Sequence, residues 1–185
     1  MKLKVIALAG ALLTPLAVFG GEVGSLDLPD LQGLQHQATD SVNISLDPWL
    51  LGTMSAFMDD KDADSAAMKK MLSGIKSIQN RSFAFGTDFV YPASAIDGIR
   101  QQLSAPGWSK MVQVHNHKER EDVDIYLMMD QHRANGFALI ASDPRQLTII
   151  NIVGSINMDD LPMLERHFHI PPWATHGQLM SALTS

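Results

Sequence analysis

Apolar and polar residues follow two different periods along this chain, and the periods divide it into helical and strand-like segments. In the first half, apolar residues recur at helical spacing over about 47–58, 64–75 and 92–103, which predicts three amphipathic helices. Asp47-Pro48 is a helix-start signal, because Asp can cap free backbone amides and proline loses nothing at the first helical position. Residues 42–46 instead alternate as a half-buried strand does.

Large apolar side chains on the first of these helices are predicted to face a core. The stripe consists of Leu50, Leu51, Met54, Phe57 and Met58. The three tryptophans, Trp49, Trp108 and Trp173, each border a helix or a strand. We therefore expect them to be packing anchors rather than a carbohydrate platform.

Strand patterns dominate the second half of the chain. Together with 78–85 upstream, the predicted strands are 112–114, 123–129, 137–141 and 147–153. Turn signals at Asn135-Gly136 and Asp143-Pro144 separate the last three. The segment 147–153 is apolar on both faces, which predicts a central strand that is covered on both sides. A final amphipathic helix is predicted over about 156–168.

This order of elements predicts an α+β fold. We expect a mostly antiparallel sheet, made of a C-terminal four-strand meander plus one or two N-terminal strands, with helices packed on one face. A single domain is predicted over residues 40–170. We expect residues 21–39 to be a loose leader with a short helix, and residues 171–185, which begin with two prolines, to be a flexible C-terminal tail.

The first 20 residues have the pattern of a secretory signal peptide. Lys2 and Lys4 precede an apolar run over 5–19, and Val18-Phe19-Gly20 offers a cleavage site. The run is shorter than the roughly 20 residues that span a bilayer as a stable helix. We therefore predict a periplasmic or secreted protein with no stable membrane span after cleavage, the alternative being an uncleaved anchor.

Composition narrows the classes of function. The chain has no cysteine, which excludes disulfides, a thiol nucleophile and lipid attachment through an N-terminal cysteine. Its formal net charge is −6, and cleavage of the leader would make it more negative by removing two positive charges. An acidic protein is repelled by nucleic acid and by anionic membrane surfaces, so we expect neither as a partner.

One pair of histidines is the candidate for a metal site. His115 and His117 stand two positions apart, so on a strand they would face the same side and could both reach one Zn²⁺ or Cu²⁺. The candidates for a further metal ligand are His132, Asp124 and the pair His167 and His169. The alternative is the polar, solvent-facing side of an edge hairpin, and no cofactor is predicted.

No other motif predicts chemistry. Asp60, Asp62 and Asp64 have the spacing of a Ca²⁺ loop, but Ser65 and Met71 replace its glycine and its bidentate Glu, so a solvated helix start explains the run. Serines occur outside any G-x-S-x-G setting, and no phosphate-binding glycine loop is present. We therefore predict no catalytic residue.

Several segments resemble one bacterial family, the domain of unknown function 4252 (DUF4252). The segments that carry the resemblance are 72–75, 81–83, 106–108, 123–126, 136–140 and 146–156, followed by Leu161 and Leu164. The resemblance spans roughly residues 40–170 and implies export. Some members of the family are lipid-anchored, and this chain departs from those because it lacks cysteine. No catalytic residue is implied.

These observations lead us to expect a non-enzymatic envelope protein that binds another protein or a small ligand. An exposed apolar patch or an unprotected sheet edge would favour this interpretation. Two alternatives remain: a periplasmic metal-binding protein that uses His115 and His117, and a hydrolase whose site is assembled from distant residues.

Overall fold

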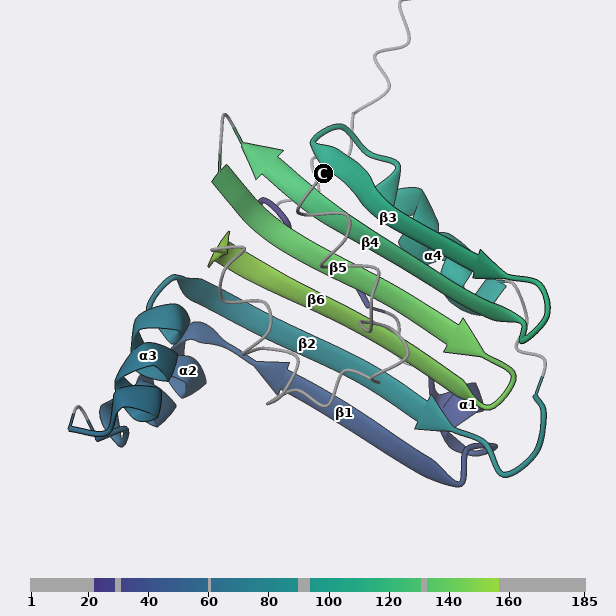
Figure 1. Cartoon of the computed structure of the whole chain (residues 1–185), viewed down its shortest axis with the longest axis horizontal. Helices are drawn as coiled ribbons and strands as arrows, with labels where there is room; N and C mark the ends of the chain where they lie inside the picture. Colours follow the sequence, from purple (N-terminus) through teal and green to yellow (C-terminus); the bar gives the residue numbers. More distant parts are fainter. Residues whose placement is uncertain (1–21, 29–30, 60, 90–93, 131–132, 157–185) are drawn as a thin grey trace, which may run out of the picture.

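The structure is a computed structural model, and it describes residues 22–28, 31–59, 61–89, 94–130 and 133–156. Six strands form one antiparallel sheet with the order β1-β2-β6-β5-β4-β3 (Figure 1). The strands are β1 (Asp40–Leu46), β2 (Ile75–Ala84), β3 (Trp108–Asn116), β4 (Glu121–Asp130), β5 (Arg133–Asp143) and β6 (Gln146–Ile156). The α+β class and the four-strand meander β3–β6 are confirmed.

Four helices accompany the sheet in the described part of the chain. They are α1 (Gln32–Gln35), α2 (Pro48–Ala56), α3 (Ala63–Leu72) and α4 (Ser94–Leu103). Asp47 caps α2, since its side chain accepts from the backbone N–H of Leu50 at 2.8 Å. Asp62 caps α3 in the same way through Ser65, so the acidic run marks a helix start as the sequence predicted.

The sheet buries apolar side chains on both faces, because alternate residues of a strand point to opposite sides. Leu139 belongs to one core cluster, which also receives Leu51 of α2 and residues of α3. Ile140 belongs to the other cluster, which receives α1 and α4. Helices therefore pack on both faces, whereas the sequence predicted them on one. The segment of β6 that is largely apolar on both faces lies between β2 and β5, as expected for a central strand.

Residues 22–28 lie against the sheet and are not the loose leader that the sequence predicted. Leu26 and Leu28 are buried in the same core cluster as α1 and α4. Asn151 of β6 is 0% exposed, and its side chain binds the backbone of this segment. Its Oδ1 accepts from Leu26 N–H at 2.9 Å, and its Nδ2 donates to the carbonyl of Gly24 at 2.9 Å. This segment is therefore part of the fold.

Strand β2 starts at Ile75, three residues earlier than predicted, where the backbone of β6 comes close. Gly154 has φ +134°, and a Cβ atom there would lie 2.3 Å from the carbonyl oxygen of Gly74. Ser155 donates its backbone N–H to that same oxygen at 2.8 Å. Glycine at position 154 is therefore required by this close approach.

The predicted helix over 156–168 and the tail over 171–185 lie outside the described residues beyond Ile156.

Candidate functional site

The two candidate metal ligands lie at the tip of the β3–β4 hairpin. His115 pairs with Asp122 one pair before the end of the β3–β4 ladder, and its Nδ1 contacts the Asp122 carboxylate. The rings of His115 and His117 are in contact edge to face, with centroids 4.1 Å apart and an interplanar angle of 89°. Within the described ranges, no group of three or more His, Asp or Glu side chains could hold a metal ion.

The further ligands that the sequence left open are not brought to this pair. Asp124 is buried and forms ion pairs with Lys110 at 2.9 Å and with Arg100 of α4 at 3.7 Å. His132, His167 and His169 lie outside the described residues. His115 therefore has Asp122 as its acidic neighbour. In the described part of the chain, the two histidines are not part of a set of three side chains that could hold a metal ion.

The Asp124 ion pairs join α4 to the sheet. Lys110 also lies over the ring of Tyr126, with its Nζ 5.2 Å from the ring centroid. Partial burial acts to lower the pKa of Lys110, but its hydrogen bonds with Asp124 and Tyr126 outweigh this and raise that pKa above its ordinary value. Lys110 therefore stays charged and holds Asp124 in place, which is a structural role.

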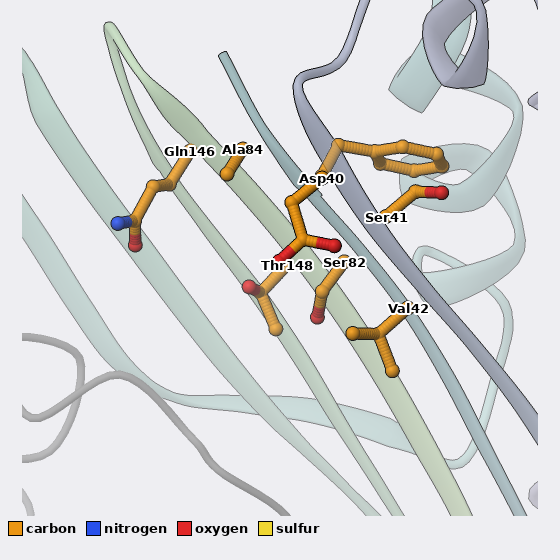
Figure 2. A pocket seen from close by; sticks show the side chains of 8 residues that line it. Asp40, Ser41, Val42, Ser82, Ala84, Gln146 and Thr148 are labelled. Atoms are coloured by element: carbon orange, nitrogen blue, oxygen red, sulfur yellow. The ribbon is translucent and has the colours of Figure 1, made fainter. Parts of the chain in front are cut away.

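A polar hollow of about 160 Å³ lies where β1, β2 and β6 run side by side. Its lining residues are Asp40, Ser41, Val42, Ser82, Phe83, Ala84, Gln146 and Thr148 (Figure 2). The strand register explains the grouping: Val42 pairs with Ser82, and Ser82 pairs with Thr148. Asp40 lies two pairs further along, opposite Ala84. The hollow therefore lies at the end of the sheet where β1 begins.

The lining of the hollow offers hydrogen bonds but no acid–base pair. On the face of Val42 it offers the carboxylate of Asp40, the hydroxyls of Ser82 and Thr148 and the side-chain amide of Gln146, and the described lining residues include no histidine, lysine or arginine. No motif in the sequence signals this hollow, because its residues come together only through the register of three strands.

Strand β1 is an edge of the sheet, and after Asp40 at its start it carries none of the charged residues that protect many edge strands. Its pairing with β2 is regular over all seven residues, and the strand contains no lysine, arginine or proline. Val42 is 43% exposed, and Asn43 and Ser45 are exposed as well. The opposite edge, β3, carries Lys110 and an irregularity in register between Lys110 and Val112. Of these two edges, β1 is the open one.

Helix α2 follows β1 after one residue and exposes large apolar side chains. Trp49 is 75% exposed, Phe57 just beyond the helix is 87% exposed, and Met54 is exposed too. Leu51, on the other side, is 2% exposed and packs in the core. The sequence placed Met54 and Phe57 in a core-facing stripe and Trp49 among the packing anchors, and the structure shows all three at the surface. A helix that is apolar all round has no single stripe, so its periodicity could not predict which side packs.

These features define an α+β domain with a six-stranded antiparallel sheet, one open edge and an exposed aromatic helix beside that edge. A family model described as "Domain of unknown function (DUF4252)" matches residues 36–164. The chain therefore belongs to this family, which confirms the resemblance. The comparisons with curated proteins and with solved structures found no match. Among the described residues, no helix is long and apolar enough to cross a membrane.

Proposed function

We propose that this protein is an exported, non-enzymatic interaction module of the cell envelope, and that β1 with the exposed side of α2 is its binding surface. We call this the β1–α2 surface and define it by Val42, Asn43, Trp49 and Phe57. The observation that carries the proposal is the exposure of Trp49 and Phe57 on the helical segment that follows the edge strand β1 after one residue. Export is proposed from the signal-peptide pattern of residues 1–20.

Two physical arguments support a binding role for this surface. Exposed aromatic side chains gain free energy when a partner covers them, and tryptophan is enriched among residues that dominate binding energy. An edge strand offers backbone N–H and C=O groups that a second strand can pair with. The edge strand and the helix with the exposed aromatic residues are adjacent along the chain, because only Asp47 separates β1 from α2.

Site-specific photo-crosslinking tests the proposal. A benzophenone amino acid would replace Phe57 in the full chain, which would be expressed with its leader in a bacterial host. Irradiation should give a discrete crosslinked product at position 57. The matched control is the same replacement at Met111 on the opposite edge, which is also exposed and should give little product. Equal products at the two positions would contradict the proposal.

A pair of substitutions separates binding from folding. Trp49→Ala combined with Phe57→Ala should abolish the partner contact and change the free energy of unfolding by less than about 1 kcal/mol, because both side chains are exposed. Leu51→Ala on the buried side of the same helix should cost about 2–5 kcal/mol. If the double variant were as unstable as Leu51→Ala, the two aromatic residues would be core residues and the proposal would fail.

Export is tested by cell fractionation. The full chain should be recovered from the periplasm or the medium with its first 20 or so residues removed, and deletion of those residues should leave it in the cytoplasm. A deletion variant that still leaves the cytoplasm would contradict this part of the proposal.

A further inference from the structure

We propose that the partner of the β1–α2 surface is a second copy of this chain, and that β1 pairs antiparallel with β1 of that copy about a two-fold axis at Asn43. This inference rests on the proposed function and names its partner. The result would be a closed dimer with a continuous sheet across two subunits.

The sequence of β1 is self-complementary in this register. With Asn43 opposite Asn43 of the second copy, Val42 lies opposite Ile44, and Ser41 lies opposite Ser45. Val42 and Ile44 share one face of the strand, so four β-branched side chains would form one apolar strip across the axis. Ser41, Asn43 and Ser45 would form a polar strip on the other face.

The charges also favour this pairing. The whole chain is acidic, so two copies repel each other over most of their surfaces. Residues 41–46 carry no charge, and the acidic residues on either side do not meet in this register. Asp40 would lie opposite Leu46 of the second copy, and Asp47 would lie opposite Thr39. The β1 edge is therefore a place where two acidic copies can approach without like charges facing each other.

The two-fold axis would bring α2 of one copy toward the hollow of the other. The hollow lies at the Asp40 end of β1, whereas α2 begins after the Leu46 end (Figure 1). Antiparallel pairing puts these two ends side by side. Leu46 and Leu51 belong to the same core cluster, so α2 lies on the face to which Val42 and Leu46 both point. The start of α2 would then lie near the end of the second copy's sheet that holds the hollow.

The two edges of the sheet differ in a way that predicts a dimer and not a fibre. β3 is protected by Lys110 and by its irregular register, so it does not offer a second open edge for further copies. A single self-complementary edge gives a closed pair with two-fold symmetry.

Cysteine crosslinking tests the register directly, because the chain has no cysteine of its own. The mature chain with Asn43→Cys should form a disulfide-linked dimer under mild oxidation, since residues opposite each other in an antiparallel pair have Cα atoms roughly 5 Å apart. Ser41→Cys alone should not form one, because the two cysteines would be offset by about 14 Å along the strands. A mixture of Ser41→Cys and Ser45→Cys should form the mixed dimer.

A charge exchange tests the dimer without crosslinking. Light scattering should give a dimer for the mature chain and a monomer for both Asn43→Lys and Asn43→Asp, because each places like charges together on the axis. An equimolar mixture of the two variants should form the dimer again. Gln113→Lys on β3 is the matched control and should remain dimeric, because it adds the same charge at the other edge.

The outcomes separate this inference from the proposed function. A mature chain that is monomeric at all concentrations, or a dimer that Asn43→Lys leaves intact, would overturn the inference. If position 57 still gave a specific crosslink in cells, and that product contained a different protein, the proposed function would stand with another occupant. If position 57 gave no specific product and the protein were monomeric, both would fail.

Discussion

The backbone N–H of Leu26 donates to Oδ1 of Asn151 at 2.9 Å, which joins two residues 125 positions apart in the sequence. The same amide group donates from Nδ2 to the carbonyls of Gly24 and Phe137. Asn151 lies on the largely apolar central strand β6, and its side chain thus binds the backbone of residues 22–28 through these hydrogen bonds. This contact makes residues 22–28 part of the fold.

Replacement of Asn151 should therefore destabilise the protein. Asn151→Ala would leave the buried N–H of Leu26 and the carbonyl of Gly24 without partners, so we expect a loss of about 2–3 kcal/mol in the free energy of unfolding. Urea unfolding of the mature chain measures this loss. Amide hydrogen exchange should also become faster at Leu26. The exposed substitution Gln113→Ala is the control and should change the free energy by less than about 0.5 kcal/mol. Equal effects of the two substitutions would contradict the role of Asn151.

Two glycines should respond in opposite directions to the same substitution. Gly154→Ala should destabilise by about 2 kcal/mol or more, because φ is +134° and the new Cβ would lie 2.3 Å from the carbonyl oxygen of Gly74. Gly98→Ala inside α4 should stabilise by roughly 0.5–1 kcal/mol, since a Cβ there has no neighbour within 4 Å and alanine favours the helix. Thermal unfolding of both variants checks the pair. Destabilisation of similar size in both would refute the assignment of strain to position 154.

The Asp88 carboxylate should titrate below its ordinary range. Hydrogen bonds from Arg120 and Arg145 hold the pKa of Asp88 below its ordinary value of 3.8. A lowered pKa means that folding favours the charged form, so this contribution is present above pH 3.8 and is lost as the pH falls through the native pKa. The group is fully exposed, so the effect on stability is small and is screened by salt.

Carboxyl NMR titration is the direct measurement for Asp88. Arg145→Gln should raise the pKa of Asp88 toward 3.8, because one of its two hydrogen-bonding cations is lost. Lys118→Gln is the control, since it removes an exposed cation two positions from Arg120 for which the structure shows no contact with Asp88. An unchanged Asp88 pKa in Arg145→Gln would show that this contact does not persist in solution.

Elements whose signal is local could be predicted from the sequence. The segment 147–153 is apolar on both faces, and this alone identified β6 as a central strand. Asp47-Pro48 fixed the start of α2, because a cap and a proline act on their own backbone. The antiparallel meander followed from the turn signals between successive strands.

The features that depend on contacts between distant residues could not be predicted. The polar hollow exists only in the register of β1, β2 and β6, and no motif within any one strand signals it. Asn151 has no neighbour in sequence that would reveal Leu26 as its partner. The exposure of Trp49 and Phe57 was also hidden, because a helix that is apolar on every side does not show which side the sheet will cover.

The histidine pair gives the last prediction. A zinc ion that bound the native protein at His115 and His117 would stabilise it in proportion to RT ln(1 + [Zn²⁺]/Kd). The described residues supply no third ligand, and Nδ1 of His115 already contacts the Asp122 carboxylate. We therefore expect chelator-treated protein to unfold at the same urea concentration with and without added zinc. The variant with His115→Ala and His117→Ala should behave in the same way. A zinc-dependent rise in stability that the double variant loses would instead establish a metal site here, completed by a ligand from outside the described residues.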